Sequence, residues 1–195
     1  MSQIKVNLNV DELLAITTTE ENSMFLESGV IYTYTGSTTG RSPTGKRIVF
    51  DEFTTQLVDW HNNTKIEEEE YKKLKNEFEN FKNKNNLYSQ DVWAVRDPKY
   101  AVPFKVFTEY ANHSLFVRNM FIPNEEKKFK KKWEILHFPS LKKEPLVAIS
   151  FKYRQILISG TLYSGEIKKS AFTVLNYLFP LFYKSLPMHC SINVD

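Results

Sequence analysis

Ile156-Leu-Ile-Ser-Gly-Thr-Leu-Tyr-Ser-Gly-Glu-Ile-Lys-Lys169 passes from a strand pattern through a turn into a helix pattern. The aliphatic residues at 156–158 predict a buried strand that ends at Ser159, and the glycine-containing turn leads into a helix that begins near Glu166. In open α/β folds, a strand-to-helix junction of this kind places side chains at the mouth of the sheet, where ligands bind. The segment therefore predicts an α/β fold and a candidate site at the turn.

The rest of the chain repeats this mixture of short strands and helices. Apolar runs of strand length cover residues 30–35, 46–50, 101–107, 115–117, 133–138, 146–151 and 188–194. Helix patterns cover residues 11–16, 64–86 and 166–177, and Pro180 closes the last one. One face of the second helix carries apolar residues at helical spacing, namely Tyr71, Leu74, Phe78 and Phe81. The order predicts one mixed α/β domain over residues 1–195, with a mixed β-sheet flanked by helices.

Composition limits the class of protein. The 195 residues are 42% hydrophobic and include 15 Phe and 10 Tyr, which is enough for a sizeable core and excludes disorder of the whole chain. A single Cys excludes a disulfide framework and a cysteine-rich zinc module. The formal net charge of +3 does not by itself indicate a nucleic-acid partner. The mean hydropathy is −0.41 and the amino-terminal residues lack a signal-peptide pattern, so we expect a cytoplasmic protein without a membrane span.

Gly40-Arg-Ser-Pro-Thr-Gly-Lys46 has the G-x-x-x-x-G-K spacing of a phosphate-binding P-loop. A true P-loop continues with Ser or Thr and opens a helix, whereas Arg47 follows here and residues 46–50 predict a strand. We therefore interpret Arg41 as a planar charged fork for a substrate carboxylate or phosphate. The alternative is a surface turn with a solvated arginine.

The turn that opens the last helix offers a phenol, Tyr163, and two adjacent lysines, Lys168 and Lys169. Adjacent residues leave a helix about 100° apart, so the two lysines cannot face one pocket equally. If one of them is buried, its pKa falls and the neutral amine can act as a base or bind a metal. The alternative is that both lie on the surface near the start of the helix.

Near the end of the chain, His189 stands beside Cys190. An imidazole suits Mn²⁺, Fe²⁺ or Zn²⁺, and a structural histidine is the alternative. His61, His113 and His137 form no ligand spacing with it, so we expect them to be structural or on the surface. Cys190 has no visible group that would activate a thiolate, which predicts a buried structural thiol.

Lys127-Lys-Phe-Lys-Lys-Lys132 is the one basic cluster. Phe129 and Trp133 lie four residues apart and could anchor a helical turn with the lysines outside. An RNA-binding or anion-binding patch is one interpretation, and a solvated surface is the other.

Together, these segments resemble the amino-terminal half of ATP-dependent phosphoenolpyruvate carboxykinases. The family's T-G-R-S-P loop is matched at residues 39–43, and its G-T-x-Y-x-G-E-x-K-K run is matched at residues 160–169. Its N-Y-x-x-P and M-H-C-S-x-N-V segments are matched at residues 176–180 and 188–194, and residues 116–122 resemble a further family segment. The chain departs from the family pattern around the first loop, at Thr38, Gly45 and His61.

The resemblance implies a role for each matched residue. Arg41 would hold the substrate carboxylate, and Tyr163 would line the same pocket and contact the substrate or carbon dioxide. Lys169, as a neutral amine, and His189 would bind Mn²⁺, while Lys168 would face phosphate or stay structural. The implied reaction converts oxaloacetate and ATP, with Mg²⁺ accompanying the nucleotide, into phosphoenolpyruvate, carbon dioxide and ADP in gluconeogenesis.

In the family, the chain continues past the position of Val194 into a true P-loop, an aspartate metal ligand and further arginines. We therefore expect an amino-terminal part that lacks the carboxy-terminal ATP-binding domain and cannot complete catalysis alone. Its expected partners are a small-molecule substrate and a complementary carboxy-terminal fragment, with neither membrane nor nucleic acid. Two alternatives stay open, namely a stand-alone, non-catalytic dicarboxylate-binding domain and a basic RNA-binding or partner-binding module.

Overall fold

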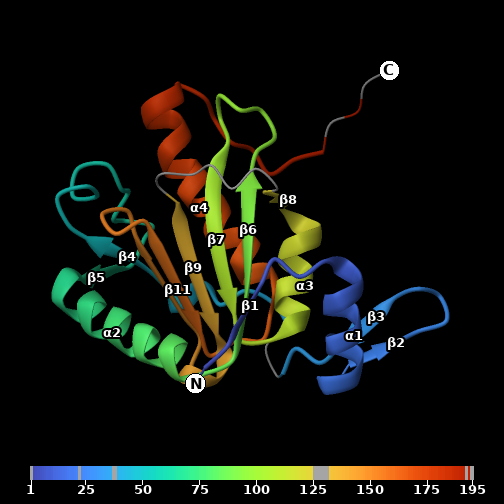
Figure 1. Cartoon of the computed structure of the whole chain (residues 1–195). Helices are drawn as coiled ribbons and strands as arrows, with labels where there is room; N and C mark the ends of the chain where they lie inside the picture. The colour runs from blue at the N-terminus through green and yellow to red at the C-terminus, as the bar shows by residue number, and fades with distance from the viewer. Residues whose placement is uncertain (1, 22, 37–38, 125–131, 192, 194–195) are drawn as a thin grey trace.

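The computed structural model describes residues 2–21, 23–36, 39–124, 132–191 and 193. Within these residues, one mixed sheet contains nine strands, and a separate hairpin pairs two more (Figure 1). The strands of the sheet are β1 Ile4–Val6, β4 Lys46–Phe50, β5 Lys65–Glu67, β6 Leu87–Ala94, β7 Val102–Thr108, β8 Ile122–Pro123, β9 Trp133–Phe138, β10 Leu146–Ser150 and β11 Gln155–Ser159. The hairpin strands are β2 Ser23–Phe25 and β3 Ile31–Thr33.

The strand order in the sheet is β1-β6-β7-β9-β11-β10-β4-β5, and β8 pairs with β6 outside this path. The β7–β9, β9–β11, β10–β4, β4–β5 and β1–β6 pairs are parallel, while the β6–β7, β6–β8 and β10–β11 pairs are antiparallel. The predicted mixed sheet flanked by helices is therefore confirmed.

The described residues form four α-helices, namely α1 Val10–Glu20, α2 Glu68–Lys84, α3 Ala111–Met120 and α4 Gly165–Leu178 (Figure 1). Of these, α2, α3 and α4 pack on the sheet and α1 packs against α3. In α1, the Asn9 side chain accepts a hydrogen bond from the Glu12 N–H at 2.9 Å, and the Glu12 carboxylate accepts one from the Asn9 N–H at 2.8 Å. This reciprocal capping box explains why the helix begins one residue before the predicted range.

The two faces of the sheet have separate cores. Alternate residues along one strand point to opposite faces, so Ile135 packs in the core under α4 while its neighbour Leu136 packs in the core under α2. The α4 core receives Ile167, Ala171 and Val174 from the helix, and the α2 core receives Tyr71 and Phe78. All of these side chains are buried, so each helix is held by the apolar stripe that its sequence shows.

The prediction of a strand at 115–117 is wrong, because these residues lie inside α3. Three apolar residues are too few to separate a strand from the buried face of a helix. Leu115 and Val117 are both buried, one against α1 and the other in the α4 core, which accounts for the continuous apolar run.

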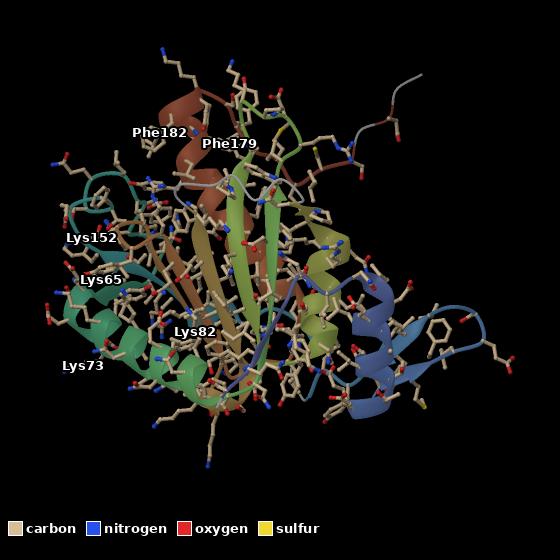
Figure 2. All side chains as sticks on the ribbon, in the orientation of Figure 1. Lys65, Lys73, Lys82, Lys152, Phe179 and Phe182 are labelled. Atoms are coloured by element: carbon tan, nitrogen blue, oxygen red, sulfur yellow. The ribbon has the colours of Figure 1, made fainter. Side chains whose placement is uncertain are left out.

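The chain beyond α4 also differs from its prediction. The α-helix ends at Leu178, but Pro180 does not end the helical backbone, because residues Phe179–Tyr183 form a π-helical turn. The described residues of the predicted strand 188–194 are not in a strand. They are exposed and have no paired neighbour, and a strand needs such a neighbour to satisfy its backbone. Figure 2 shows Phe179 and Phe182 at this end of α4.

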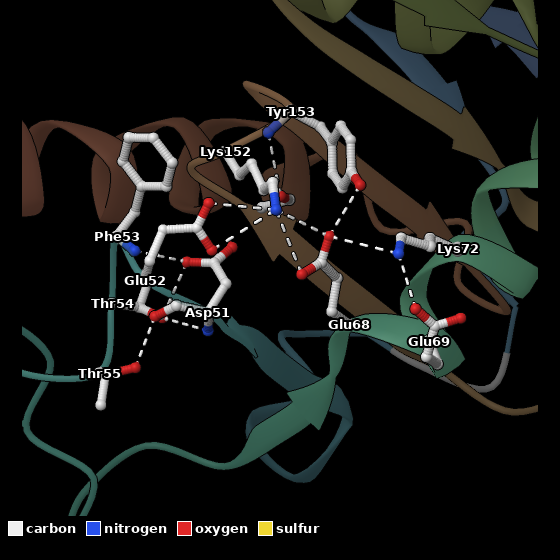
Figure 3. Close-up of polar contacts among 11 residues, drawn as sticks. Asp51, Glu52, Phe53, Thr54, Thr55, Glu68, Glu69, Lys72, Lys152 and Tyr153 are labelled. Atoms are coloured by element: carbon white, nitrogen blue, oxygen red, sulfur yellow. Dashed lines mark hydrogen bonds and ion pairs between the residues drawn. The ribbon is translucent and has the colours of Figure 1, made fainter.

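A charged network ties the start of α2 to the β10–β11 turn (Figure 3). The Lys152 Nζ lies 3.1 Å from the Glu52 carboxylate and 3.0 Å from the Glu68 carboxylate. The Tyr153 hydroxyl donates to Glu68 at 2.8 Å. The hydrogen bonds to Glu68 and Glu52 raise the pKa of Lys152, so this lysine has a structural partner on each side.

Candidate functional site

The first residues of α4 and the turn before β4 enclose a cavity of about 190 Å³. Its lining consists of Arg41, Ser42, Lys46, Asn62, Val147, Glu166, Lys169, Ser170 and Thr173. Two of the predicted site residues, Arg41 and Lys169, are thus brought together although 128 positions separate them in the numbering. Three cationic side chains share the cavity with a single carboxylate, so it is suited to an anion.

The carboxylate in this cavity belongs to Glu166, which is 4% exposed. Its Oε2 accepts a hydrogen bond from the Ser42 N–H at 3.2 Å, which joins the Arg41 turn to the first turn of α4. Burial raises the pKa of Glu166, while the Ser42 hydrogen bond and the charges of Arg41 and Lys46 oppose that rise. Glu166 is therefore a buried carboxylate whose charge is favoured by the nearby Arg41 and Lys46.

Lys46 is a site residue that the sequence reasoning missed. Burial lowers its pKa, the nearby charge of Arg41 lowers it further, and Glu166 opposes both effects. Strand alternation offered a signal for it, because Lys46 lies two positions before Ile48, whose side chain points into the α4 core. The alternation places the Lys46 side chain on the face that α4 covers.

The P-loop-like spacing at residues 40–46 does not make a P-loop. Residues Pro43–Gly45 form one turn of 3₁₀ helix, and β4 follows directly, as predicted. The departure from the family pattern at Gly45 has a steric reason, because a Cβ there would lie 2.4 Å from the Pro145 carbonyl oxygen. Thr38 lies outside the described residues, and His61 is exposed.

The turn from Gly160 to Gly165 carries Tyr163, which precedes Glu166 by three residues but is not part of the cavity lining. Gly160 has φ of +70°, and a Cβ there would lie 2.0 Å from the Glu144 carbonyl oxygen. The Tyr163 ring occupies the space of a side chain at Gly165, since a Cβ there would lie 2.5 Å from the ring. Both glycines are therefore required by close packing at the entrance to α4.

The predicted metal ligands Lys169 and His189 lie beside the same aromatic ring. The Lys169 Nζ is 5.9 Å from the centre of the Phe172 ring, and the His189 ring is 6.2 Å from it between centroids. Within the described residues, no group of three or more His, Cys, Asp or Glu side chains could hold a metal ion. Both donors thus lie near Phe172, and the metal role of Lys169 and His189 stays a prediction. Lys168 is partly buried and lies outside the cavity lining.

The predictions for the other histidines agree with the structure, whereas the prediction for the cysteine does not. His113 and His137 are buried, and His61 is exposed, in agreement with structural or surface roles. The prediction of a buried thiol is wrong, because Cys190 is exposed in the extended segment after α4. No described element covers this segment.

Most of the basic cluster lies outside the described residues, since residues 125–131 are not among them. At its end, the Lys132 Nζ lies 2.6 Å from Asp91 Oδ1. Trp133 begins β9, so a helical turn does not extend to this residue. Of the helices in the described ranges, none has the length and apolar character needed to cross a membrane.

A mixed sheet with a cavity lined by basic residues at a strand-to-helix junction is typical of α/β domains that take anionic ligands. Comparison with known proteins identifies the family within this class. A family model described as "Phosphoenolpyruvate carboxykinase" matches residues 2–195. The chain belongs to this family.

Curated relatives carry the name "Phosphoenolpyruvate carboxykinase (ATP)". The protein of Rhizobium meliloti is 37% identical over 207 residues, which cover 100% of this chain and 38% of the relative. That of Methylobacterium radiotolerans is 36% identical over 96% of this chain and 37% of the relative. That of Caldanaerobacter subterraneus is 36% identical over 96% of this chain and 38% of the relative. The chain thus spans less than two fifths of the length of these relatives and corresponds to an amino-terminal part.

Proposed function

We propose that this chain supplies the substrate-carboxylate site of an ATP-dependent phosphoenolpyruvate carboxykinase. The observation that carries the proposal is the single cavity in which Arg41, Lys46 and Lys169 surround the buried Glu166. Oxaloacetate carries two carboxylates, and the Arg41 guanidinium with the neighbouring Lys46 side chain complements such an anion.

In the proposed reaction, the C–C bond to the departing carboxylate of oxaloacetate breaks and its electron pair stays on the substrate as an enolate. The enolate oxygen then attacks the γ-phosphorus of ATP, which gives phosphoenolpyruvate and ADP. Arg41 binds a carboxylate through its planar fork, and Lys46 supplies a second basic group in the same cavity. Tyr163 contacts the substrate or the departing carbon dioxide from the adjoining turn.

Lys169 and His189 are proposed to supply two ligands of a Mn²⁺ ion. Such a cation, when bound, stabilises negative charge on the enolate and phosphoryl oxygens. The two donors approach Phe172 from two segments of the chain, α4 and the extended segment after it.

Calorimetry with oxaloacetate tests the proposed site. We expect binding by the wild-type chain, strengthened by Mn²⁺, and a loss of affinity of about tenfold or more in Arg41→Gln, because a charge-assisted bidentate contact is removed. Arg47→Gln is the matched control, since the Arg47 guanidinium donates to the Thr44 and Lys46 carbonyls and does not line the cavity. Equal affinities of the two variants would show that the substrate is bound elsewhere.

A non-catalytic dicarboxylate-binding domain is the second candidate, and the same cavity supports it. The two candidates differ in turnover. We expect this polypeptide alone to give no phosphoenolpyruvate from oxaloacetate and ATP. Addition of a carboxy-terminal polypeptide from a relative is expected to give turnover under the carboxykinase proposal and none under the binding-domain proposal.

A further inference from the structure

Two buried histidines hold the turn that carries Tyr163. The His113 Nε2 lies 2.8 Å from the Leu162 carbonyl oxygen, and the His137 Nε2 lies 3.0 Å from the Thr161 carbonyl oxygen. The side chains are 1% and 0% exposed. The two carbonyls belong to the two residues directly before Tyr163, so the chain is fixed at two consecutive peptide groups.

These contacts determine the protonation state of both rings. A carbonyl oxygen only accepts hydrogen bonds, so Nε2 carries a proton in each imidazole. Burial lowers the pKa of His113 to about 4 and lowers that of His137 well below its usual value. Both rings are therefore neutral near pH 7, with Nδ1 bare. Neither Nδ1 has a hydrogen-bond partner in the part of the chain that the structure describes. In this tautomer the unpaired buried atom is a nitrogen lone pair and not an N–H donor.

The histidines come from two different elements and touch each other. Their ring centroids are 4.4 Å apart. His137 lies on β9, where it is in register with Thr108 of β7 on one side and Ile158 of β11 on the other. His113 lies on α3. The turn is therefore attached by hydrogen bonds to an interior strand of the sheet and to a helix.

The other end of the turn is fixed by the start of α4. The Tyr163 carbonyl accepts a hydrogen bond from the Glu166 N–H at 3.1 Å, and the Tyr163 ring lies against Gly165. We propose that His113 and His137 are positioning residues, which act through the Leu162 and Thr161 carbonyls to set the place of Tyr163 against the first turn of α4. The part of this inference that concerns substrate rests on the proposed carboxykinase site.

The first test is the tautomer, which is independent of any substrate. Long-range ¹H–¹⁵N spectra of the full chain report the proton positions of its four histidines. The signals of His113 and His137 are assigned by their disappearance in His113→Gln and His137→Gln. In the wild-type chain at pH 6, we expect these signals to be those of neutral rings protonated on Nε2. A cationic ring, or a proton on Nδ1, at either position would overturn the assignment.

The second test separates positioning from general stability. His113→Leu removes the donor, His113→Gln keeps an N–H near the Nε2 position, and Leu115→Ala is a control that destabilises the same helix elsewhere. We expect amide hydrogen exchange at Tyr163, Glu166 and Ile167 to rise about tenfold or more in His113→Leu and to stay near wild type in the other two. Equal exchange in His113→Leu and Leu115→Ala would overturn the proposal.

Oxaloacetate binding gives the functional readout on the same variants. The dissociation constant is expected to rise about tenfold in His113→Leu and to change by less than about threefold in His113→Gln and Leu115→Ala, because a misplaced contact group costs affinity without unfolding the domain. If the wild-type chain binds no oxaloacetate, the proposed function fails, and hydrogen exchange still decides the positioning role.

Discussion

At the scale of single residues, Gly160 and Gly29 share a left-handed backbone but differ in their surroundings. Their φ angles are +70° and +81°, yet a Cβ at Gly160 would lie 2.0 Å from a carbonyl oxygen, while a Cβ at Gly29 would meet nothing within 4 Å. We expect Gly29→Ala to lower the free energy of unfolding by about 1–2 kcal/mol, and Gly160→Ala to lower it by at least about 3 kcal/mol. Denaturant unfolding measures both changes. Equal losses would mean that backbone conformation alone matters at Gly160.

The buried histidine pair predicts a pH dependence of stability. Because the pKa of each folded ring lies below that of the unfolded chain, the unfolded state takes up more protons as the pH falls. Stability is therefore complete above about pH 6.5 and is lost as the pH falls toward the folded value, with His113 contributing a loss of about 3 kcal/mol.

Unfolding curves at several pH values between 7 and 4.5 give the slope of stability against pH. His113→Gln is expected to reduce that slope by about one proton relative to wild type, because Gln does not titrate. Carboxylates titrate in both proteins, so the comparison removes their contribution. An unchanged slope would contradict the assignment of a neutral, buried His113.

Some single site residues could be foreseen, and others could not. Arg41 and Lys169 stood in short motifs that combine glycine, hydroxyl and basic residues, a local pattern that indicates anion chemistry. Lys46 was seen only as part of a P-loop-like spacing, and its importance comes from burial beside Arg41 and Glu166. Its proximity to Glu166 depends on the long-range pairing of β4 with β10 and of β10 with β11, which precedes α4, and a local motif does not show this.

At the scale of elements, α2 is joined to the sheet by a buried polar contact as well as by its apolar stripe. The Tyr71 hydroxyl donates to Gln155 Oε1 at 3.0 Å, and Gln155 donates in turn to Glu134 at 3.2 Å. We expect Tyr71→Phe to lower the free energy of unfolding by about 1–2 kcal/mol, because the Gln155 oxygen loses its buried donor.

Urea unfolding of Tyr71→Phe is compared with that of Tyr32→Phe. Tyr32 is 57% exposed on the β2–β3 hairpin, so its hydroxyl is expected to contribute less than about 0.5 kcal/mol. A similar small effect in both variants would show that the α2–β11 contact adds nothing to the apolar packing.

Elements with strong patterns were predicted closely. The bounds of β4 and β9 match the predicted ranges, and α2 begins four residues later than its predicted pattern because residues Lys65–Glu67 form β5. The strand β6 was missed, although it pairs with three others. Its sequence includes Ser89, Gln90 and Asp91, which are buried, and buried polar residues hide a strand from any search for apolar runs.

At the scale of the molecule, several groups of apolar side chains are exposed in the described part of the chain. One follows α4 and includes Phe182, Leu186 and Met188, which are exposed by 69%, 73% and 66%. Clusters of exposed apolar side chains mark interaction surfaces or aggregation sites. In the proposed enzyme, this segment is the surface available to the complementary carboxy-terminal part.

Sedimentation velocity of the isolated chain tests this surface. We expect concentration-dependent self-association, which the double variant Phe182→Ser with Leu186→Ser reduces and which Met24→Ser leaves unchanged. Met24 is 58% exposed on the hairpin and serves as the control for a second apolar surface. If only Met24→Ser reduces association, the hairpin is the interaction surface instead.

The parallel pairing of β4 with β10 has a consequence for the order of events during synthesis. Val147 is in register with Lys46, so one side of β4 has no partner until about 100 further residues have left the ribosome. At about 5–20 residues per second, this wait lasts roughly 5–20 s. During that time the nascent chain exposes an unpaired strand edge. The cavity also cannot form until Glu166 and Lys169, in the second half of the chain, have been made.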